Sequence, residues 1–163
     1  MLKKLRELHK NSTGFTIIEI MIVLTVAGLI ILIVFLAVPQ LQRNQRNQRR
    51  KDVTNRIKAE VENYASNNNG SLPTADANAA TGFNTGGGFP GRYLSNVNYN
   101  DPKTNAAMTL ATWTSDASVN TQATIYYVLG RTCNGEASQG ASAANYVMML
   151  QLEGGAIYCV DNK

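Results

Sequence analysis

Histidine and cysteine, on which many active sites and metal centres depend, are nearly absent from this chain. Its 163 residues include one histidine, His9, and two cysteines, Cys133 and Cys159. Serine and cysteine hydrolases need a histidine beside the nucleophile, and the two cysteines lack the CxxC spacing of redox motifs. Two cysteines also supply too few ligands for zinc. We therefore expect no metal, no cofactor and no ordinary hydrolase chemistry; an enzyme that uses a lysine or a carboxylate is the alternative left open.

Residues 71–108 lack any helical or strand periodicity and are rich in Gly, Asn, Ala and Thr. The glycine-rich stretch at residues 85–91 contains no Gly-Lys-Ser/Thr, and no strand-to-helix pattern surrounds it, so it does not predict a phosphate site. We expect a long ordered loop, with at most a short helix or strand.

The strongest positive feature is an apolar run at residues 15–38 that contains a single charged side chain, Glu19. Its length suits a membrane-spanning helix. An unpaired acid near the end of such a helix costs about 2.5–3.5 kcal/mol, so it is expected where it gains a partner or stays hydrated at the interface. Glu19 is the fifth residue counted from Phe15, which follows Gly14 directly.

Gly14, Phe15 and Glu19, followed by the apolar run, resemble the amino-terminal signature of type IV pilins and the related pseudopilins. In that family a membrane peptidase cuts after the glycine, and the new amino-terminal phenylalanine is methylated. The glutamate recognises the terminus of a neighbouring subunit during filament assembly. The resemblance therefore implies processing between Gly14 and Phe15 and an assembly role for Glu19.

The segment 1–14 has the composition of a removable, cytoplasmic leader. It carries four basic residues against the single acid Glu7, which suits the cytoplasmic face of a membrane. A secretory signal would place its cleavage site after the apolar run instead. Five basic residues between Arg43 and Lys51 conflict with this orientation, so we take the orientation from the resemblance.

The helix is expected to continue beyond the membrane as an amphipathic segment, residues 39–69. Val53, Ile57, Val61 and Tyr64 or Ala65 recur at three- and four-residue spacing and predict an apolar stripe that packs on a sheet. Three asparagines and a glycine at residues 67–70 predict the end of the helix. Two residues, Gly28 and Pro39, are plausible weak points.

The rest of the chain, residues 70–163, predicts an extracytoplasmic head. Strands are expected at residues 108–114, 124–129, 146–152 and 156–160, with a hairpin turn at Gly154 and Gly155. Tyr146, Met148 and Leu150 alternate with other residues and predict the core-facing side of the third strand. The expected fold class is α+β: a long amino-terminal helix packed against a small antiparallel sheet, as in type IV pilins.

Seven basic residues between Arg43 and Lys58 accompany one acid, Asp52. Such a positive collar could face an acidic surface of another subunit. A solvated helix face or contact with anionic lipid headgroups is the alternative.

The two cysteines of an exported head favour a disulfide, with two buried thiols as the alternative. A Cys133–Cys159 bridge also resembles the disulfide-bounded carboxyl-terminal loop of many type IV pilins. Residues 134–145 would then form an exposed excursion.

The resemblance implies a structural subunit, a pilin, that supports adhesion, surface motility or DNA uptake. Its partners would be other copies of itself and related pilins, the prepilin peptidase, the inner-membrane assembly machinery and, before assembly, membrane lipid. The precursor would cross the cytoplasmic membrane once, and the mature subunit would join an extracellular filament. A pseudopilin of a type II secretion-like system and a membrane-anchored adhesin outside any filament are the alternatives.

Contact with DNA has no spacing to support it. Phosphate contacts and base stacking would call for basic and aromatic residues in one track. The candidates are Arg92, Lys103, Arg131 and Lys163, near Tyr93, Tyr99, Tyr126 or Tyr127.

Overall fold

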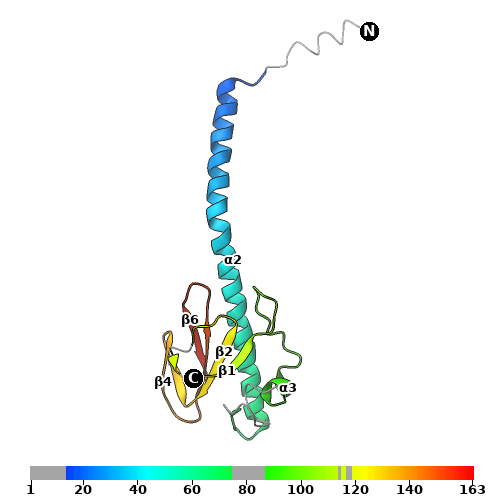
Figure 1. Cartoon of the computed structure of the whole chain (residues 1–163), viewed down its shortest axis with the longest axis vertical. Coiled ribbons are helices and arrows are strands. Elements are labelled where there is room, and N and C mark those ends of the chain that lie inside the picture. Colours follow the sequence, from blue (N-terminus) through cyan, green and yellow to red (C-terminus); the bar gives the residue numbers. More distant parts are fainter. Residues whose placement is uncertain (1–13, 75–86, 114, 117–118) are drawn as a thin grey trace, which may run out of the picture. The chain divides into compact units, whose positions relative to one another are not determined.

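The structure, a computed structural model, describes residues 14–74, 87–113, 115–116 and 119–163. The expected leader, apart from Gly14, and residues 75–86 of the glycine-rich loop lie outside the described residues. The elements are α2 (Ile17–Asn67), α3 (Phe89–Tyr93), β1 (Thr109–Thr112), β2 (Thr124–Leu129), β3 (Arg131–Asn134), β4 (Ala137–Gly140), β5 (Tyr146–Gln151) and β6 (Ile157–Asp161) (Figure 1).

The chain divides into two compact units, Met1–Gln42 and Arg43–Lys163, and α2 contributes residues to both. In the first unit the described residues are 14–16, which precede α2, and the apolar half of α2, residues 17–42. Gly28 and Pro39 both lie inside α2. The single chain therefore keeps its helix through both expected weak points, and melting in a filament stays a prediction.

The second unit contains a four-stranded sheet of order β1-β2-β5-β6. β2, β5 and β6 pair antiparallel, as expected, but β1 pairs parallel to β2, with Thr109 opposite Thr124. The sheet is therefore mixed, and the expectation of a wholly antiparallel sheet was wrong at this edge. Parallel strands need a crossover connection rather than a tight turn. Residues 113–123 supply that connection.

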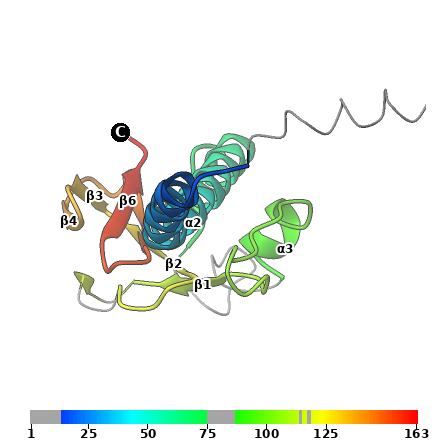
Figure 2. The ribbon, with the colours of Figure 1, turned by 90° about the horizontal axis from the view of Figure 1, so that it is seen from above.

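The helix packs on one face of this sheet through the predicted stripe. Ile57, Val61 and Tyr64 are buried against residues of β2 and β5, and Figure 2 shows α2 over one face of the strands. Val53 is partly buried beside them. Among the β5 residues, Tyr146, Met148 and Leu150 belong to the same core, as their alternation predicted.

The opposite face of β5 is also buried, which the sequence analysis did not anticipate. Val147 and Met149 form a second cluster with Val119. Part of this face is covered by the β3–β4 hairpin, a separate two-stranded sheet whose strand β4 lies within residues 134–145, the expected exposed excursion. Cys133 lies in β3 and packs against the cluster. The excursion therefore contains a strand, but most of its residues are exposed, as expected.

The helix ends where the asparagines and glycine predicted. Asn69 and Gly70 have φ of 53° and 81°, the left-handed conformation that asparagine and glycine tolerate at a helix end. The loop that follows contains one short helix, α3, whose Phe89 and Tyr93 pack around Tyr64 with ring centroids 6.0 and 5.3 Å from it. Residues of the loop thus complete the core over the last turns of α2.

Candidate functional site

The amino-terminal motif lies at the start of α2. Gly14, Phe15 and Thr16 precede the helix, which begins at Ile17. The Phe15 side chain is 84% exposed, and a Cβ added to Gly14 would meet nothing within 4 Å. The bond between Gly14 and Phe15 is therefore free of contacts with the described part of the chain.

Glu19 closes a capping box with Thr16. The Thr16 amide and hydroxyl donate to Glu19 Oε2 at 2.9 and 2.8 Å, and the Glu19 amide donates to Thr16 Oγ1 at 3.3 Å. Such a box satisfies amide groups that have no partner within the helix. Its sequence signal, Thr followed three residues later by Glu, was present but was not used in the sequence analysis. In this chain Glu19 therefore acts first on the start of its own helix.

The apolar half of α2 offers a continuous lipophilic surface. α2 is the one helix among the described residues that is long and apolar enough to cross a membrane, and none of its most apolar window is buried. Phe35 and Leu36, for example, are 74% and 73% exposed. This surface has no partner within the described chain.

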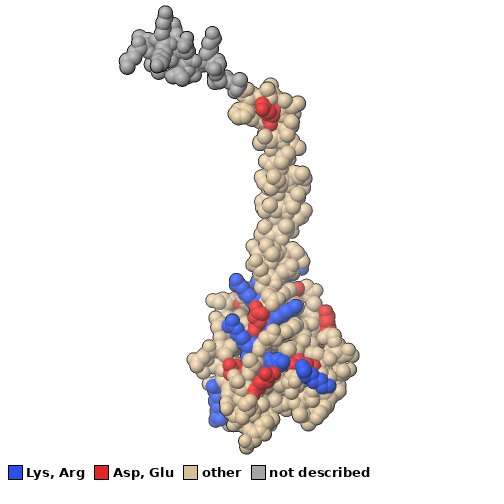
Figure 3. All heavy atoms as spheres, turned by 180° about the vertical axis from the view of Figure 1, so that it is seen from behind, with Lys and Arg blue, Asp and Glu red and all other residues tan. Residues whose placement is uncertain are grey.

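The expected positive collar is partly used inside the head. Arg46 donates to both carboxylate oxygens of Glu153, each at 2.7 Å. Arg50 is buried and donates from Nε to Asp101 Oδ1 at 2.6 Å, and its Nη1 lies 3.3 Å from Glu153 Oε1. We call these four side chains the ion-pair cluster. Figure 3 accordingly shows basic and acidic side chains interleaved over one face of the head.

The ion-pair cluster joins three separate segments of the head. Asp101 also accepts hydrogen bonds from the backbone amides of Lys103 and Thr104 at 3.2 and 3.1 Å, which closes a loop around it. Glu153 and Asn47 exchange two further bonds, from the Glu153 amide and to the Glu153 carbonyl, at 2.9 and 3.0 Å. A buried charge is stable only when it is paired and hydrogen-bonded, so these contacts make Arg50 tolerable in the interior.

The acids of this cluster have depressed pKa values. Burial alone would raise the pKa of Asp101, but the hydrogen bond and charge of Arg50 and the two backbone amides outweigh it. The pKa of Glu153 is lowered chiefly by the hydrogen bond from Arg46, against the opposing effect of burial. Both carboxylates are therefore held in the charged form.

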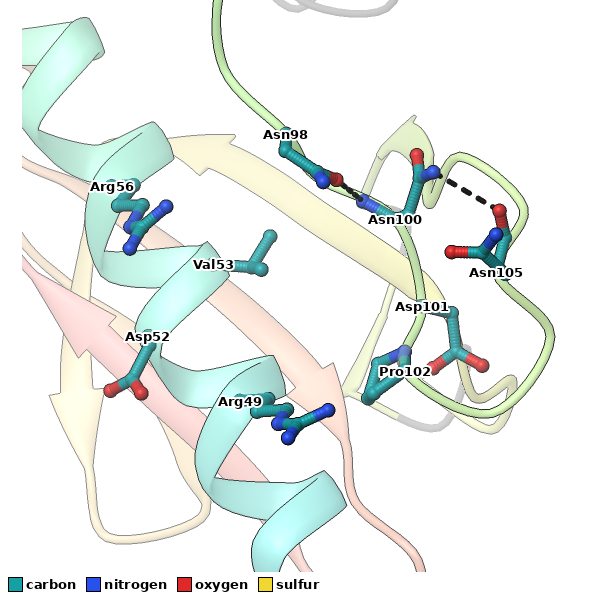
Figure 4. A pocket seen from close by; sticks show the side chains of 9 residues that line it. All are labelled: Arg49, Asp52, Val53, Arg56, Asn98, Asn100, Asp101, Pro102 and Asn105. Atoms are coloured by element: carbon teal, nitrogen blue, oxygen red, sulfur yellow. Dashed lines mark hydrogen bonds between the residues drawn. The ribbon is translucent and has the colours of Figure 1, made fainter.

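A pocket of about 280 Å³ lies beside this cluster. Arg49, Val53 and Arg56 line it from α2, and the loop of residues 98–105 lines it with asparagines and Pro102 (Figure 4). We call it the two-arginine pocket. Neither Arg49 nor Arg56 forms an ion pair or hydrogen bond with any described residue.

The Cys133–Cys159 disulfide joins β3 to β6, with the two Cα atoms 5.9 Å apart. Asp161 strengthens the same junction, because it accepts hydrogen bonds from the Thr132 hydroxyl and, at 2.7 Å, from the Cys133 amide. Asp116 accepts from the Ser138 hydroxyl at 2.7 Å on β4. The base of the β3–β4 hairpin is therefore fixed to the head at several points.

The residues considered for nucleic-acid contact do not form an exposed stacking track. Tyr127 is buried, and the other three tyrosines pack against the two cores. Arg131 lies over the Trp113 ring at 4.3 Å and donates to Ser138. No group of three or more metal-ligating side chains occurs within residues 14–74, 87–113, 115–116 and 119–163.

Comparison with known proteins identifies the amino-terminal region. Residues 9–35 match the prokaryotic N-terminal methylation motif, which is the hallmark of type IV pilin-like prepilins. Comparisons with curated proteins and with solved structures gave no match. The layout of a long apolar helix followed by a small mixed sheet fits the type IV pilin-like fold.

Proposed function

We propose that this type IV pilin-like prepilin is a structural subunit of a type IV pilus-like surface filament. The observation that carries the proposal is the bare apolar half of α2, most of which belongs to the methylation motif of residues 9–35. Burial of apolar surface contributes about 25 cal/mol per Å². A helix whose apolar side chains are exposed on all sides therefore needs lipid first, and the equivalent helices of other subunits afterwards.

Processing would begin at the exposed bond after Gly14. The prepilin peptidase would remove residues 1–14, and Phe15 would become the methylated amino terminus. The inner-membrane assembly machinery would then transfer the subunit from the membrane into the filament. Residues 15–38 form the filament core in this scheme, residues 39–69 continue the helix, and residues 70–163 form the external head.

Glu19 would change partners during this transfer. In the capping box its charge is stabilised by hydrogen bonds from Thr16, which supplies no opposite charge. After cleavage, the Phe15 amine of an adjacent subunit supplies a positive charge, which attracts the carboxylate strongly in a low-dielectric filament core. This exchange favours assembly because an acid without a charged partner is costly in the membrane.

The head has the features of an exported domain. A disulfide persists in oxidising compartments, and Cys133–Cys159 joins two strands here. The motif fits a pseudopilin equally well, and a membrane-anchored adhesin that forms no filament is the competitor from another class. The filament would support adhesion, surface motility or DNA uptake through the external contacts of its heads.

Shearing cells that express the wild-type chain tests the proposal. We expect the sheared fraction to contain long fibres that antibodies against residues 70–163 decorate in immunogold images. Mass spectrometry of the same fibres should find a chain that begins with N-methylated Phe15. A processed protein that stays in the membrane without surface fibres would favour the pseudopilin. A functional, unprocessed chain that begins before Phe15 would favour the independent adhesin.

A further inference from the structure

The two-arginine pocket has charge available for an anion. Arg49 and Arg56 are seven residues apart on α2, so their Cα atoms lie about 10 Å apart along the helix axis. Figure 4 shows both side chains on the side of α2 that faces the loop of residues 98–105, with Val53 between them. Both arginines are exposed.

The acids that line the pocket are already engaged elsewhere. Asp101 is bound by the buried Arg50, and Asp52 accepts a hydrogen bond from Gln48 at 3.1 Å. Arg50 offsets the charge of Asp101, and Arg49 and Arg56 outnumber Asp52, so the pocket retains a net positive charge. Asparagine side chains from the loop, Asn98 and Asn105 among them, add groups that can donate to an anion.

One exposed acid of the head carries an unpaired negative charge that could complement this pocket. Glu136 is the acidic side chain within the described residues that forms neither an ion pair nor a hydrogen bond. It is exposed in the two-residue turn between β3 and β4, after Gly135 with φ of 63°. Because the base of this hairpin is fixed by the disulfide and by Asp116 and Asp161, the turn is presented on a rigid support.

The hairpin and the pocket face different directions. Figures 1 and 2 both place the β3–β4 hairpin on one side of α2 and α3, which leads into the pocket loop, on the other. We propose that Glu136 of one subunit enters the two-arginine pocket of a second copy of this chain. Two different patches make a head-to-tail contact, which gives a ring if the rotation between copies closes and an open helical assembly if it does not, and the proposed filament is the second case.

This inference rests on the proposed filament and names one contact between its heads. A carboxylate between two guanidinium groups forms charge-assisted hydrogen bonds, which are among the stronger ones in proteins. The contact would also give the partly unused collar a specific partner. The ion-pair cluster next to it would hold the pocket loop in place, since Asp101 belongs to both.

Cysteine cross-linking in assembled fibres tests the contact without removing its charges. Val53→Cys places a thiol between the two arginines, and Ala137→Cys places one beside Glu136. In the double variant, mild oxidation of sheared fibres should give a ladder of covalent dimers, trimers and longer multimers. Each single variant should give no ladder. Val53→Cys combined with Ala144→Cys, a second exposed alanine of the head, is the matched control and should also give none.

The cross-linking result separates two failures. If the wild-type chain forms no fibres, the proposed function is wrong. Cross-linking in fibres then cannot test the head contact. The charge-reversal experiment below then decides it with the processed protein in detergent, where the predicted association should still be measurable by sedimentation. If fibres form but the double variant gives no ladder, or only dimers, the contact proposed here is wrong.

Charge reversal gives an independent test. Glu136→Lys should lower fibre yield, or association in detergent, about tenfold, because like charges placed together across an interface are strongly unfavourable. Arg49→Glu with Arg56→Glu should have a similar effect, and all three changes together should restore the yield to within about threefold of wild type. Glu60→Lys, a reversal elsewhere on α2, is the control. An effect of the arginine changes without one of Glu136→Lys would assign the pocket to another anion, such as a lipid headgroup, and overturn the proposal.

Discussion

The two halves of α2 find their partners in different places. In residues 17–42 most side chains are apolar yet exposed, as at Phe35. In residues 43–67 many side chains are polar or charged, yet Arg50 is only 1% exposed. One helix therefore buries a guanidinium in its second half and leaves the aromatic and aliphatic side chains of its first half bare.

This difference shows that burial follows the available partner rather than hydropathy alone. The second half of α2 meets a sheet, an acid at Asp101 and another at Glu153, all within the same head. The first half meets none of these among the described residues. A partner for it must come from outside the chain, which is the physical basis for proposing lipid and other subunits.

The largest expected effect tests whether the apolar half is released from its leader. Replacing Gly14 with Leu should block processing almost completely, so that the full-length precursor accumulates. The peptidase must approach a residue with little side-chain bulk, and glycine also permits unusual backbone angles. Immunoblotting of membranes, with mass spectrometry of the amino terminus, measures the ratio of precursor to mature chain.

The structure makes this substitution a clean probe. A side chain at Gly14 meets nothing within 4 Å in the described residues, so the variant should fold and insert normally. Thr13→Ala, next to the cut, is the control and should leave processing largely intact. Normal levels of a chain that begins at Phe15 in the Gly14→Leu variant would contradict the assigned cleavage site.

The next effect tests the charge that the apolar half carries. Glu19→Gln should sharply reduce fibres while leaving membrane insertion and cleavage largely intact. Glutamine can also close a capping box with Thr16, so this change removes the charge but retains the cap. Electron microscopy and the yield of sheared fibres, at matched amounts of mature protein, provide the measurement.

A pair of variants separates the charge from the cap. Glu19→Ala removes both and should assemble no better than Glu19→Gln. Thr16→Ala removes only the cap, at a cost of about 1 kcal/mol to the helix, and should assemble better than either. Wild-type fibre yields in both Glu19 variants would show that Glu19 is not required for assembly.

Replacing the buried Arg50, in the second half of α2, should have the largest effect on the stability of the head. Arg50→Met should lower the free energy of unfolding by about 3–5 kcal/mol, since it leaves Asp101 buried without its partner. Urea unfolding of the full-length chain in detergent, followed by fluorescence of the only tryptophan, Trp113, measures the change.

Arg49 provides the matched control one residue away. It is exposed and forms no ion pair with a described residue, so Arg49→Met should change the free energy of unfolding by no more than about 0.5 kcal/mol. Equal destabilisation by the two substitutions would show that Arg50 is not an anchor of the head.

Removing the disulfide tests how much the β3–β6 junction contributes to the stability of the head. Replacing Cys133 and Cys159 together with Ser should lower the free energy of unfolding by about 3.5 kcal/mol on the chain-entropy model for a separation of 26 residues. The same urea titration measures it, with the wild-type chain under reducing conditions as a second comparison. Non-reducing peptide maps of fresh fibres in which both thiols are free would reject the bridge in the exported protein.

Much of the fold could be predicted because periodicity and turn residues act locally. The stripe of Ile57, Val61 and Tyr64, the helix end and the bounds of β2 all follow from nearby residues. The parallel pairing of β1 and the β3–β4 hairpin could not, since both depend on contacts between distant segments. Short polar strands such as Ala137–Gly140 also carry no alternation that marks them.

The site was predictable to a similar extent. Gly14, Phe15 and Glu19 stand in a recognisable order, and the capping box of Thr16 could have been read from the same residues. Which arginines of the collar form ion pairs inside the head could not be predicted. Nothing near Arg50 in the sequence distinguishes it from Arg49, and its partners Asp101 and Glu153 lie 51 and 103 residues away.

The smallest expected effect concerns acid pH and the second half of α2. Asp101 and Glu153 have pKa values lowered by the folded structure, so they release protons more readily when folded than when unfolded. Their contribution to stability is therefore fully present at neutral pH. It is lost as the pH falls below about 4 to 5, where these groups begin to take up protons in the unfolded chain.

Arg46→Gln should lower stability at neutral pH and make this acid-induced loss smaller, because the hydrogen bond from Arg46 is the main cause of the lowered pKa of Glu153. The free energy of unfolding, measured by urea titration from pH 7 to pH 3, should fall by less in this variant than in wild type, from a lower value at pH 7. Arg43→Gln removes an equal charge from an exposed residue and should leave the profile unchanged. The residues of the apolar half offer no comparable ion pair, so the pH dependence should belong to the head alone. Coincident profiles for Arg46→Gln and Arg43→Gln would instead mean that net charge, and not the pairing with Glu153, sets the acid response.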